Sequence, residues 1–190
     1  MRKAILTTIS VLALATPVLA HPGHQETSGF FHPFSGLDHL LAMLAVGAWA
    51  SFLSAERRSA AVLVPAAFVA MMALGAAAGF AGIKLPLAEA AILTSVFALG
   101  ALVLAAVRLP SVWAMGVVGI FALFHGYAHA SEAPAGAPGG YALSFLTATT
   151  LLLVVGLGLG MVVRRRVGDL GLRALGALVV AGGAFVLVGN

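Results

Sequence analysis

The sequence contains no cysteine, which excludes disulfide bonds, redox-active thiols and thiolate metal sites. Charged residues are also scarce: they make up 8% of the 190 residues, against roughly a quarter in soluble domains. Because 62% of the residues are hydrophobic and the mean hydropathy is +1.10, a soluble globular fold is excluded as well. Any metal that this chain binds must be held by nitrogen and oxygen ligands.

The net charge of +4 does not indicate a nucleic-acid partner, because the Lys and Arg residues fall between hydrophobic runs. In membrane proteins, basic residues at such positions mark the loops that stay in the cytoplasm. The partner that this composition predicts is therefore the lipid bilayer.

The first twenty residues have the pattern of a secretory signal peptide. Arg2 and Lys3 form a charged start, an apolar stretch follows, and small residues up to Ala20 provide a cleavage site. The alternative is an uncleaved first transmembrane helix, for which the apolar stretch is short. We expect residues 1–20 to be removed, which leaves His21 as the first residue of the mature chain, outside the cytoplasm.

Six later apolar runs are long enough to be transmembrane helices. They cover residues 37–54, 59–83, 87–107, 111–130, 141–163 and 170–189. The sequence thus predicts an all-α integral membrane protein, a six-transmembrane-helix bundle preceded by a cleavable signal peptide. Residues 21–36 would form a histidine-bearing periplasmic segment and residues 37–190 the transmembrane domain.

The loops between these runs alternate in charge. Alternate connections carry Arg57 and Arg58, then Arg108, then Arg164, Arg165, Arg166 and Arg173. Lys84 is the one Lys or Arg after residue 20 that falls in the other set of loops. Since cytoplasmic loops are enriched in Lys and Arg, this pattern places the N-terminus after cleavage in the periplasm of a bacterial inner membrane, in agreement with the signal peptide.

Two further features concern the helices and their connections. Gly75 with Gly79, and Gly156 with Gly160, are spaced four apart, which lets helix backbones approach closely in a bilayer. The connector at residues 131–140 is rich in Pro and Gly, which argues against regular structure there.

Two clusters of ionisable residues lie at ends of the predicted spans. The first comprises His32, Asp38 and His39 at the start of the first span, and the second comprises His125, His129 and Glu132 at the end of the fourth. The first span begins outside and the fourth ends outside, so both clusters are expected at the outer face. Each ionisable group costs around 3 kcal/mol to insert, and such groups usually mark a functional pathway.

The spacing within each cluster predicts its geometry. His125, His129 and Glu132 project from one stripe if the helix continues through them. Asp38 and His39 are adjacent, so they point in different directions unless the chain bends at Gly36, and we expect non-helical backbone there. An alternative for Asp38 is a helix capping box, a role compatible with orienting His39.

These residue types indicate a site for a divalent transition metal. Neutral imidazole suits nickel, cobalt, zinc and iron(II), and Asp38 with Glu132 would balance the charge of the ion. The six residues could form one site or successive stations. His21 and His24 could capture the ion first, although a polar tail is an equally good interpretation. We expect the ion to be a transported substrate, with no permanently bound cofactor.

Two other functions remain open at this point. Three histidines and an Asp could hold catalytic zinc in a membrane-embedded metallohydrolase, although the sequence has no HExxH motif. A non-transporting metal sensor or assembly protein would also need such a site. The sequence has no phosphate-binding loop for ATP hydrolysis, and it leaves energy coupling and any homo-oligomer undefined.

At these clusters the sequence resembles the HupE/UreJ family of nickel and cobalt permeases. His32, Asp38 and His39 match the family's H-x5-D-H motif, and residues 124–132 match F-H-G-x-A-H-G-x-E with Ala130 in place of Gly. The resemblance covers essentially the whole chain. It implies uptake of Ni(II) or Co(II), often for hydrogenase or urease maturation, with both motifs required, but it does not fix the metal.

Overall fold

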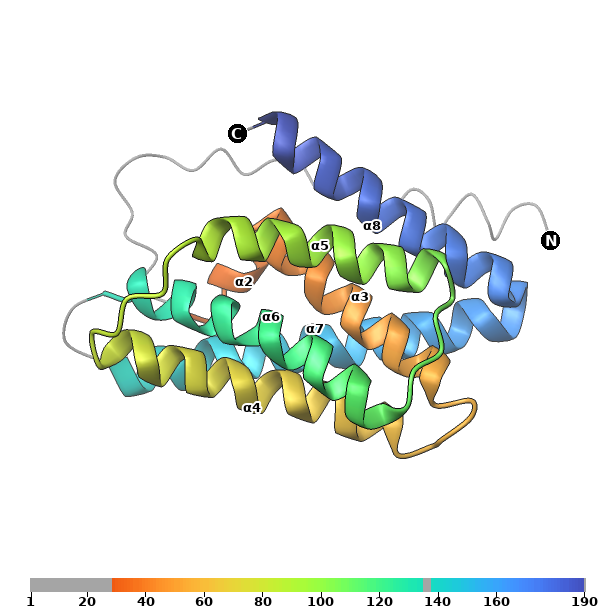
Figure 1. Ribbon diagram of the computed structural model, residues 1–190, viewed down its shortest axis with the longest axis horizontal. Helices are drawn as coiled ribbons and strands as arrows, with labels where there is room; N and C mark the ends of the chain where they lie inside the picture. The colour runs from red at the N-terminus through yellow and green to blue at the C-terminus, as the bar shows by residue number, and fades with distance from the viewer. Residues whose placement is uncertain (1–28, 135–137, 190) are drawn as a thin grey trace.

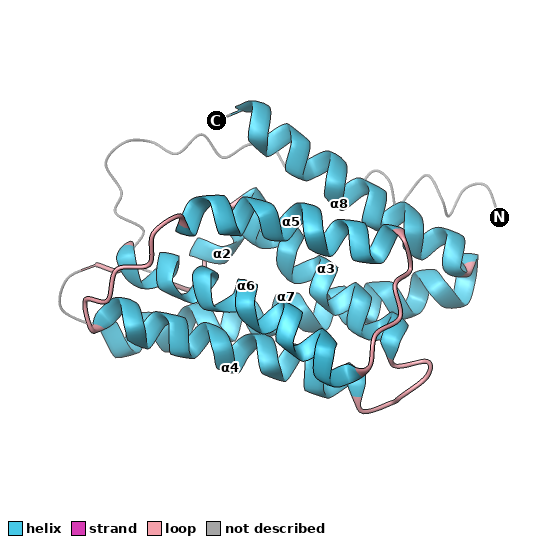
Figure 2. Cartoon of the chain, in the orientation of Figure 1, coloured by secondary structure: helices cyan, strands magenta, loops and turns pink. Residues whose placement is uncertain are grey.

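The computed structural model describes residues 29–134 and 138–189, and this part of the chain is helical throughout apart from its loops and turns (Figures 1 and 2). The helices are α2 (His32–Ser35), α3 (Leu37–Leu53), α4 (Ala60–Phe80), α5 (Ala88–Leu104), α6 (Ser111–Ser131), α7 (Pro138–Val167) and α8 (Asp169–Gly189). The predicted signal peptide, His21 and His24 lie outside the described residues.

The six longer helices follow the six predicted apolar runs closely, which confirms the prediction of an all-helical architecture. The main difference is at α7, which begins at Pro138, inside the connector that we expected to be irregular. Proline at the first position of a helix loses no hydrogen bond, because that amide has no partner within the helix. The expectation of irregular structure is therefore wrong for residues 138–140.

The outer surface of the bundle is apolar. Large side chains such as those of Trp113 (68% exposed) and Phe185 (73% exposed) point away from the other helices. Among the described residues, α4, α6, α7 and α8 are long and apolar enough to cross a membrane, and α3 and α5 are shorter apolar helices of 17 residues. Such a surface is suited to lipid.

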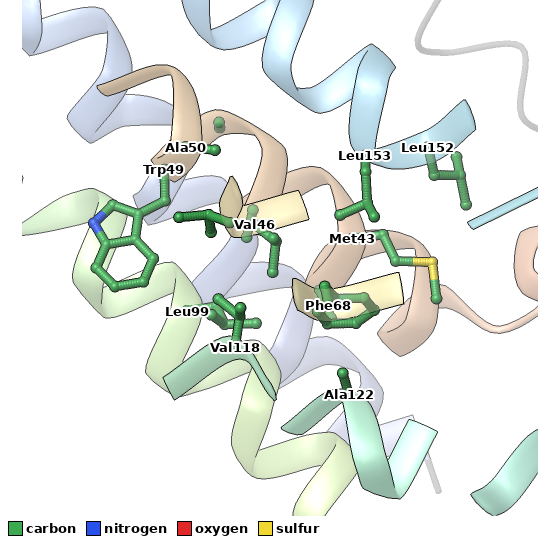
Figure 3. Packing of buried hydrophobic residues seen from close by; sticks show 14 of the residues in the cluster. Met43, Val46, Trp49, Ala50, Phe68, Leu99, Val118, Ala122, Leu152 and Leu153 are labelled. Carbon is green, nitrogen blue, oxygen red and sulfur yellow. The ribbon is translucent and has the colours of Figure 1, made fainter. Parts of the chain in front are cut away.

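The helices pack mainly in pairs: α4 on α6, α3 on α7 and α5 on α8. Helix α3 contacts every other long helix and occupies the centre, while α8 lies on the outside of the bundle beside α5 (Figure 1). Most of α3 from Ala42 onward is buried, and Met43, Val46 and Trp49 pack there against side chains of the neighbouring helices (Figure 3). This packed core fills the middle of the bundle.

Glycines allow the closest helix contacts, as predicted for Gly75 and Gly156. A Cβ at Gly75 would overlap the carbonyl oxygen of Leu123 in α6, and a Cβ at Gly156 would meet the backbone of Leu44 in α3. Gly126 of α6 makes a similar contact with the carbonyl oxygen of Met72 in α4. Each of the two helices α4 and α6 therefore provides a glycine at which the other helix's backbone approaches closely.

The end of the bundle where α3 and α7 finish is the arginine-rich end. Phe52, 2% exposed, lies beneath the guanidinium groups of Arg108 and Arg164, which are 5.1 and 5.8 Å from its ring centroid. Arg108 also pairs with Glu56 at 3.0 Å, and Arg164 pairs with Asp169 at 3.4 Å. Each half-exposed pair contributes little alone, but together they cover the apolar core at this end.

Candidate metal centre

The first cluster lies where the short helix α2 meets α3. Gly36, with φ −86° and ψ 111°, separates the two helices and confirms the non-helical backbone expected at this point. Gly36 is the N-cap residue of α3, so the position that a capping box would give to a serine or threonine is occupied by glycine. A Cβ at Gly36 would lie 2.9 Å from Oδ1 of Asp38, so a larger residue would press on that side chain.

Asp38 is bonded to His39. Its Oδ1 lies 2.9 Å from Nδ1 of His39 and also accepts a hydrogen bond from the His39 backbone amide at 2.7 Å. An ionised carboxylate can only accept, so Nδ1 carries the proton and Nε2 offers the lone pair. Metal-binding histidines are typically oriented by a carboxylate in this way.

The second cluster lies on the last two turns of α6. His125 and His129 are both fully buried. Nδ1 of His125 donates to the carbonyl oxygen of Phe121 at 3.0 Å, because a carbonyl can only accept. Nε2 of His125 is buried and has no hydrogen-bond partner among the described residues, so its lone pair is available to a ligand.

The structure brings three imidazole rings from the two clusters together. The centroid of the His39 ring lies 4.9 Å from that of His125 and 4.8 Å from that of His129. Phe145 of α7 stacks on His129, with centroids 4.7 Å apart and an interplanar angle of 14°, and Phe68 of α4 lies 5.8 Å from His125. In the histidine group, His39 with His125 and His129, aromatic side chains of α4 and α7 thus flank two of the three rings.

The three rings of the histidine group are close together, but they are not arranged around a common metal position. Among the described residues, no three His, Asp or Glu side chains are placed so that they could hold a metal ion together. The His39 ring packs edge-to-face on the other two rings, and the ligating atom of each imidazole is a ring nitrogen and not the centroid. Binding of an ion would therefore include reorientation of these rings.

Two of the predicted ligands, His32 and Glu132, are not among these three rings. His32 is in α2, and its side chain is outside what the structure describes. Helix α6 ends at Ser131, and Glu132 is its C-cap residue, with an exposed side chain. Its backbone remains helical (φ −98°, ψ −2°) and its amide donates to the carbonyl oxygen of Ala128, so Glu132 continues the helical direction of α6 by one residue. Pro134, two residues later, disfavours a longer helix. Glu132 therefore lies toward the surface.

Sequence reasoning missed the residues that hold the rings in place. Phe145 and Phe68 are ordinary core residues in an apolar run, and nothing in their spacing distinguishes them from neighbours. Gly36 could have been found, because it lies directly before a helix that begins with an ionisable pair.

Removal of the Asp38 carboxylate should weaken metal binding. We expect Asp38→Ala to lower the nickel affinity of the purified protein about 10- to 100-fold, because His39 loses the group that orients its ring. Asp38→Asn keeps one acceptor oxygen and should fall between. Equilibrium dialysis with nickel would measure both, with Asp169→Asn at the arginine-rich end as a control. Unchanged affinity in Asp38→Ala would contradict this role.

Comparison with known proteins identifies the family of this chain. The family model described as HupE / UreJ protein matches residues 9–186 of the chain. The chain is similar to "Protein HupE" of Rhizobium leguminosarum bv. viciae, with 46% identity over 189 residues that cover 97% of each protein. No solved structure matches the chain. With its apolar helices and these matches along nearly its whole length, the chain belongs to the HupE/UreJ family of multi-pass membrane proteins.

Proposed function

We propose that this protein is an inner-membrane secondary permease that takes up a divalent transition metal, with Ni(II) as the first substrate and Co(II) as the second. The observation that carries the proposal is the meeting of His39, which is mostly buried, with the fully buried His125 and His129. Buried imidazoles are costly in a membrane, and grouping them provides nitrogen ligands suited to these ions. The family is one associated with nickel and cobalt uptake.

In this proposal all six longer helices cross the membrane, with the histidine group near the periplasmic side. Helices α3 and α5 have 17 residues each, about 26 Å at 1.5 Å per residue, the lower limit for crossing. The arginines lie at the opposite end, which the excess of basic residues in cytoplasmic loops assigns to the inside. The orientation and the cleaved signal peptide are parts of the proposal.

The proposed ligands differ in their roles. His39, His125 and His129 bind the ion through Nε2, and Asp38 orients His39 and supplies negative charge. We assign the reception of the incoming ion to Glu132, which is exposed at the end of α6, and to His32. His21 and His24 would act earlier, by capturing scarce metal outside.

In this proposal the observed packing is a state that is closed toward the cytoplasm. Below the histidine group, Met43, Phe68 and Trp49 are fully buried, and Phe52 is covered by arginines at the inner end. Transport then requires a rearrangement that opens this core. A divalent ion gains about 4.6 kcal/mol on moving inward across 100 mV, enough for about three decades of accumulation without ATP.

Accumulation of radioactive nickel tests the proposal. Cells that lack their own nickel permease, supplied with nanomolar nickel, should accumulate it when they produce this protein and should not do so with an empty vector. Excess unlabelled cobalt should compete more strongly than magnesium, because magnesium prefers oxygen ligands. Accumulation equal to that of the empty vector would reject the nickel permease and favour a zinc enzyme or a metal sensor.

A further inference from the structure

Thr149 is an unusual hydroxyl within the bundle. Of the buried serine and threonine side chains in the described residues, Ser51 donates to the carbonyl oxygen of Ala48 and Ser95 to that of Ile92. Thr149 is fully buried, yet its Oγ1 has no hydrogen-bond partner within the same part of the chain. Buried polar atoms without a partner are rare and call for an explanation.

The neighbouring threonines of α7 show that the helix itself does not prevent a bond. Thr147 and Thr150 are exposed, and their hydroxyls donate to the carbonyl oxygens of Leu143 and Leu146, both at 2.7 Å. This back-bonding is the ordinary way for a threonine to satisfy its hydroxyl in a membrane helix. Thr149, the buried member of the three, does not make this bond to the carbonyl oxygen four residues earlier. Its hydroxyl is therefore free to face the helix interface.

Helix register places Thr149 at the depth of His125. Phe145 of α7 stacks on His129 of α6, which fixes these two residues at one level. Since α6 ends at the side of the bundle where α7 begins, one turn inward from that level is His125 on α6 and Thr149 on α7. Residues four apart lie on one face of a helix, so Thr149 shares the buried face of Phe145.

Two buried polar atoms without partners therefore occur at one depth, just inward of His129: Nε2 of His125 and Oγ1 of Thr149. A lone pair of imidazole nitrogen and a lone pair of hydroxyl oxygen are both ligands for a divalent cation of this class. A divalent ion at this level would satisfy both atoms at once.

We propose that Thr149 supplies an oxygen ligand to the transported divalent cation at the level of His125, as the inner part of the metal site. This inference rests on the proposed function for the identity of the ion, and it extends the site to α7, where neither sequence cluster lies. It makes Thr149 a residue that sets affinity and selectivity, because a hydroxyl oxygen favours a six-coordinate ion such as Ni(II) over softer ions.

The test compares Thr149→Val, which keeps the shape and removes the hydroxyl, with Thr149→Ser, which keeps the hydroxyl. Thr147→Val is the matched control, because it removes a lipid-facing hydroxyl from the same helix. Nickel affinity of the detergent-purified proteins and the half-saturating nickel concentration for uptake are both measured. In Thr149→Val we expect the nickel affinity to be about tenfold lower and the half-saturating nickel concentration about tenfold higher. In Thr149→Ser and Thr147→Val both values should stay near those of the intact protein.

Stability separates a ligand from a packing residue. Thr149→Val replaces an unpaired buried hydroxyl by a methyl group, so its melting temperature should equal or exceed that of the intact protein while its nickel affinity falls. Unchanged nickel affinity in Thr149→Val overturns the inference, and so does an equal loss in Thr149→Ser and Thr149→Val together with lowered melting temperatures. If the intact protein binds nickel but does not transport it, the permease proposal fails, and the binding comparison still decides the role of Thr149.

Discussion

Nickel accumulation should fall to the level of the empty vector when either His39 or His125 is replaced by alanine. The two histidines come from helices far apart in sequence, but their rings lie 4.9 Å apart, so each variant removes one ligand from the same site. Loss of a residue that merely orients a ligand costs about 10- to 100-fold, and loss of the ligand itself should cost more than that.

Membrane abundance and stability must be matched in this comparison, because His125 is fully buried and its truncation leaves a cavity. His125→Gln, which retains polar atoms and much of the volume, should be equally inactive if ligation is the cause. Tyr127→Phe is the matched control, since Tyr127 lies between His125 and His129 on α6 and its ring faces Gly79 of α4. Normal uptake by both His125 variants would remove His125 from the transport pathway.

Replacement of Gly126 by alanine should destabilise the bundle by about 3 kcal/mol or more, at the upper end of overpacking effects. The added Cβ would overlap the carbonyl oxygen of Met72, and a backbone atom cannot move aside as a flexible side chain can. We expect a lowered melting temperature in detergent and less folded protein in the membrane. Gly75→Ala should behave similarly, because its Cβ would overlap the carbonyl oxygen of Leu123.

Gly116→Ala is the control on the same helix. Gly116 is exposed, and a Cβ there would meet no atom within 4 Å, so alanine should leave stability unchanged or slightly higher. If Gly126→Ala were as stable as Gly116→Ala, the close contact of α4 with α6 would not be needed for the fold.

The helices could be predicted from the sequence because crossing a bilayer imposes a length of about twenty apolar residues. That single constraint located all six longer helices. It could not locate the start of α7, because Pro138 lies within the Pro- and Gly-rich connector. Proline is compatible with either a loop or a first helical turn.

The histidines of the candidate site could be predicted from the sequence, but the residues that surround them could not. His39, His125 and His129 stand out because ionisable residues are rare in apolar helices, and alternating loop charges assign their helix ends to one side. Thr149 and Phe145 carry no such signal, because their importance depends on which residues face them across the bundle. The pairing of Asp38 with His39 likewise depends on the extended backbone at Gly36, which sequence spacing indicated only as a bend.

Transport requires that the histidine group lies on a pathway across the membrane. The most direct measurement uses purified protein in liposomes that contain a nickel-sensitive fluorescent chelator and carry an inside-negative potassium diffusion potential. We predict nickel entry that rises with the potential in vesicles with the intact protein and is absent in vesicles with His125→Ala or without protein. Nickel binding to the intact protein without any entry into these vesicles would contradict the claim and identify a metal-binding protein that does not transport.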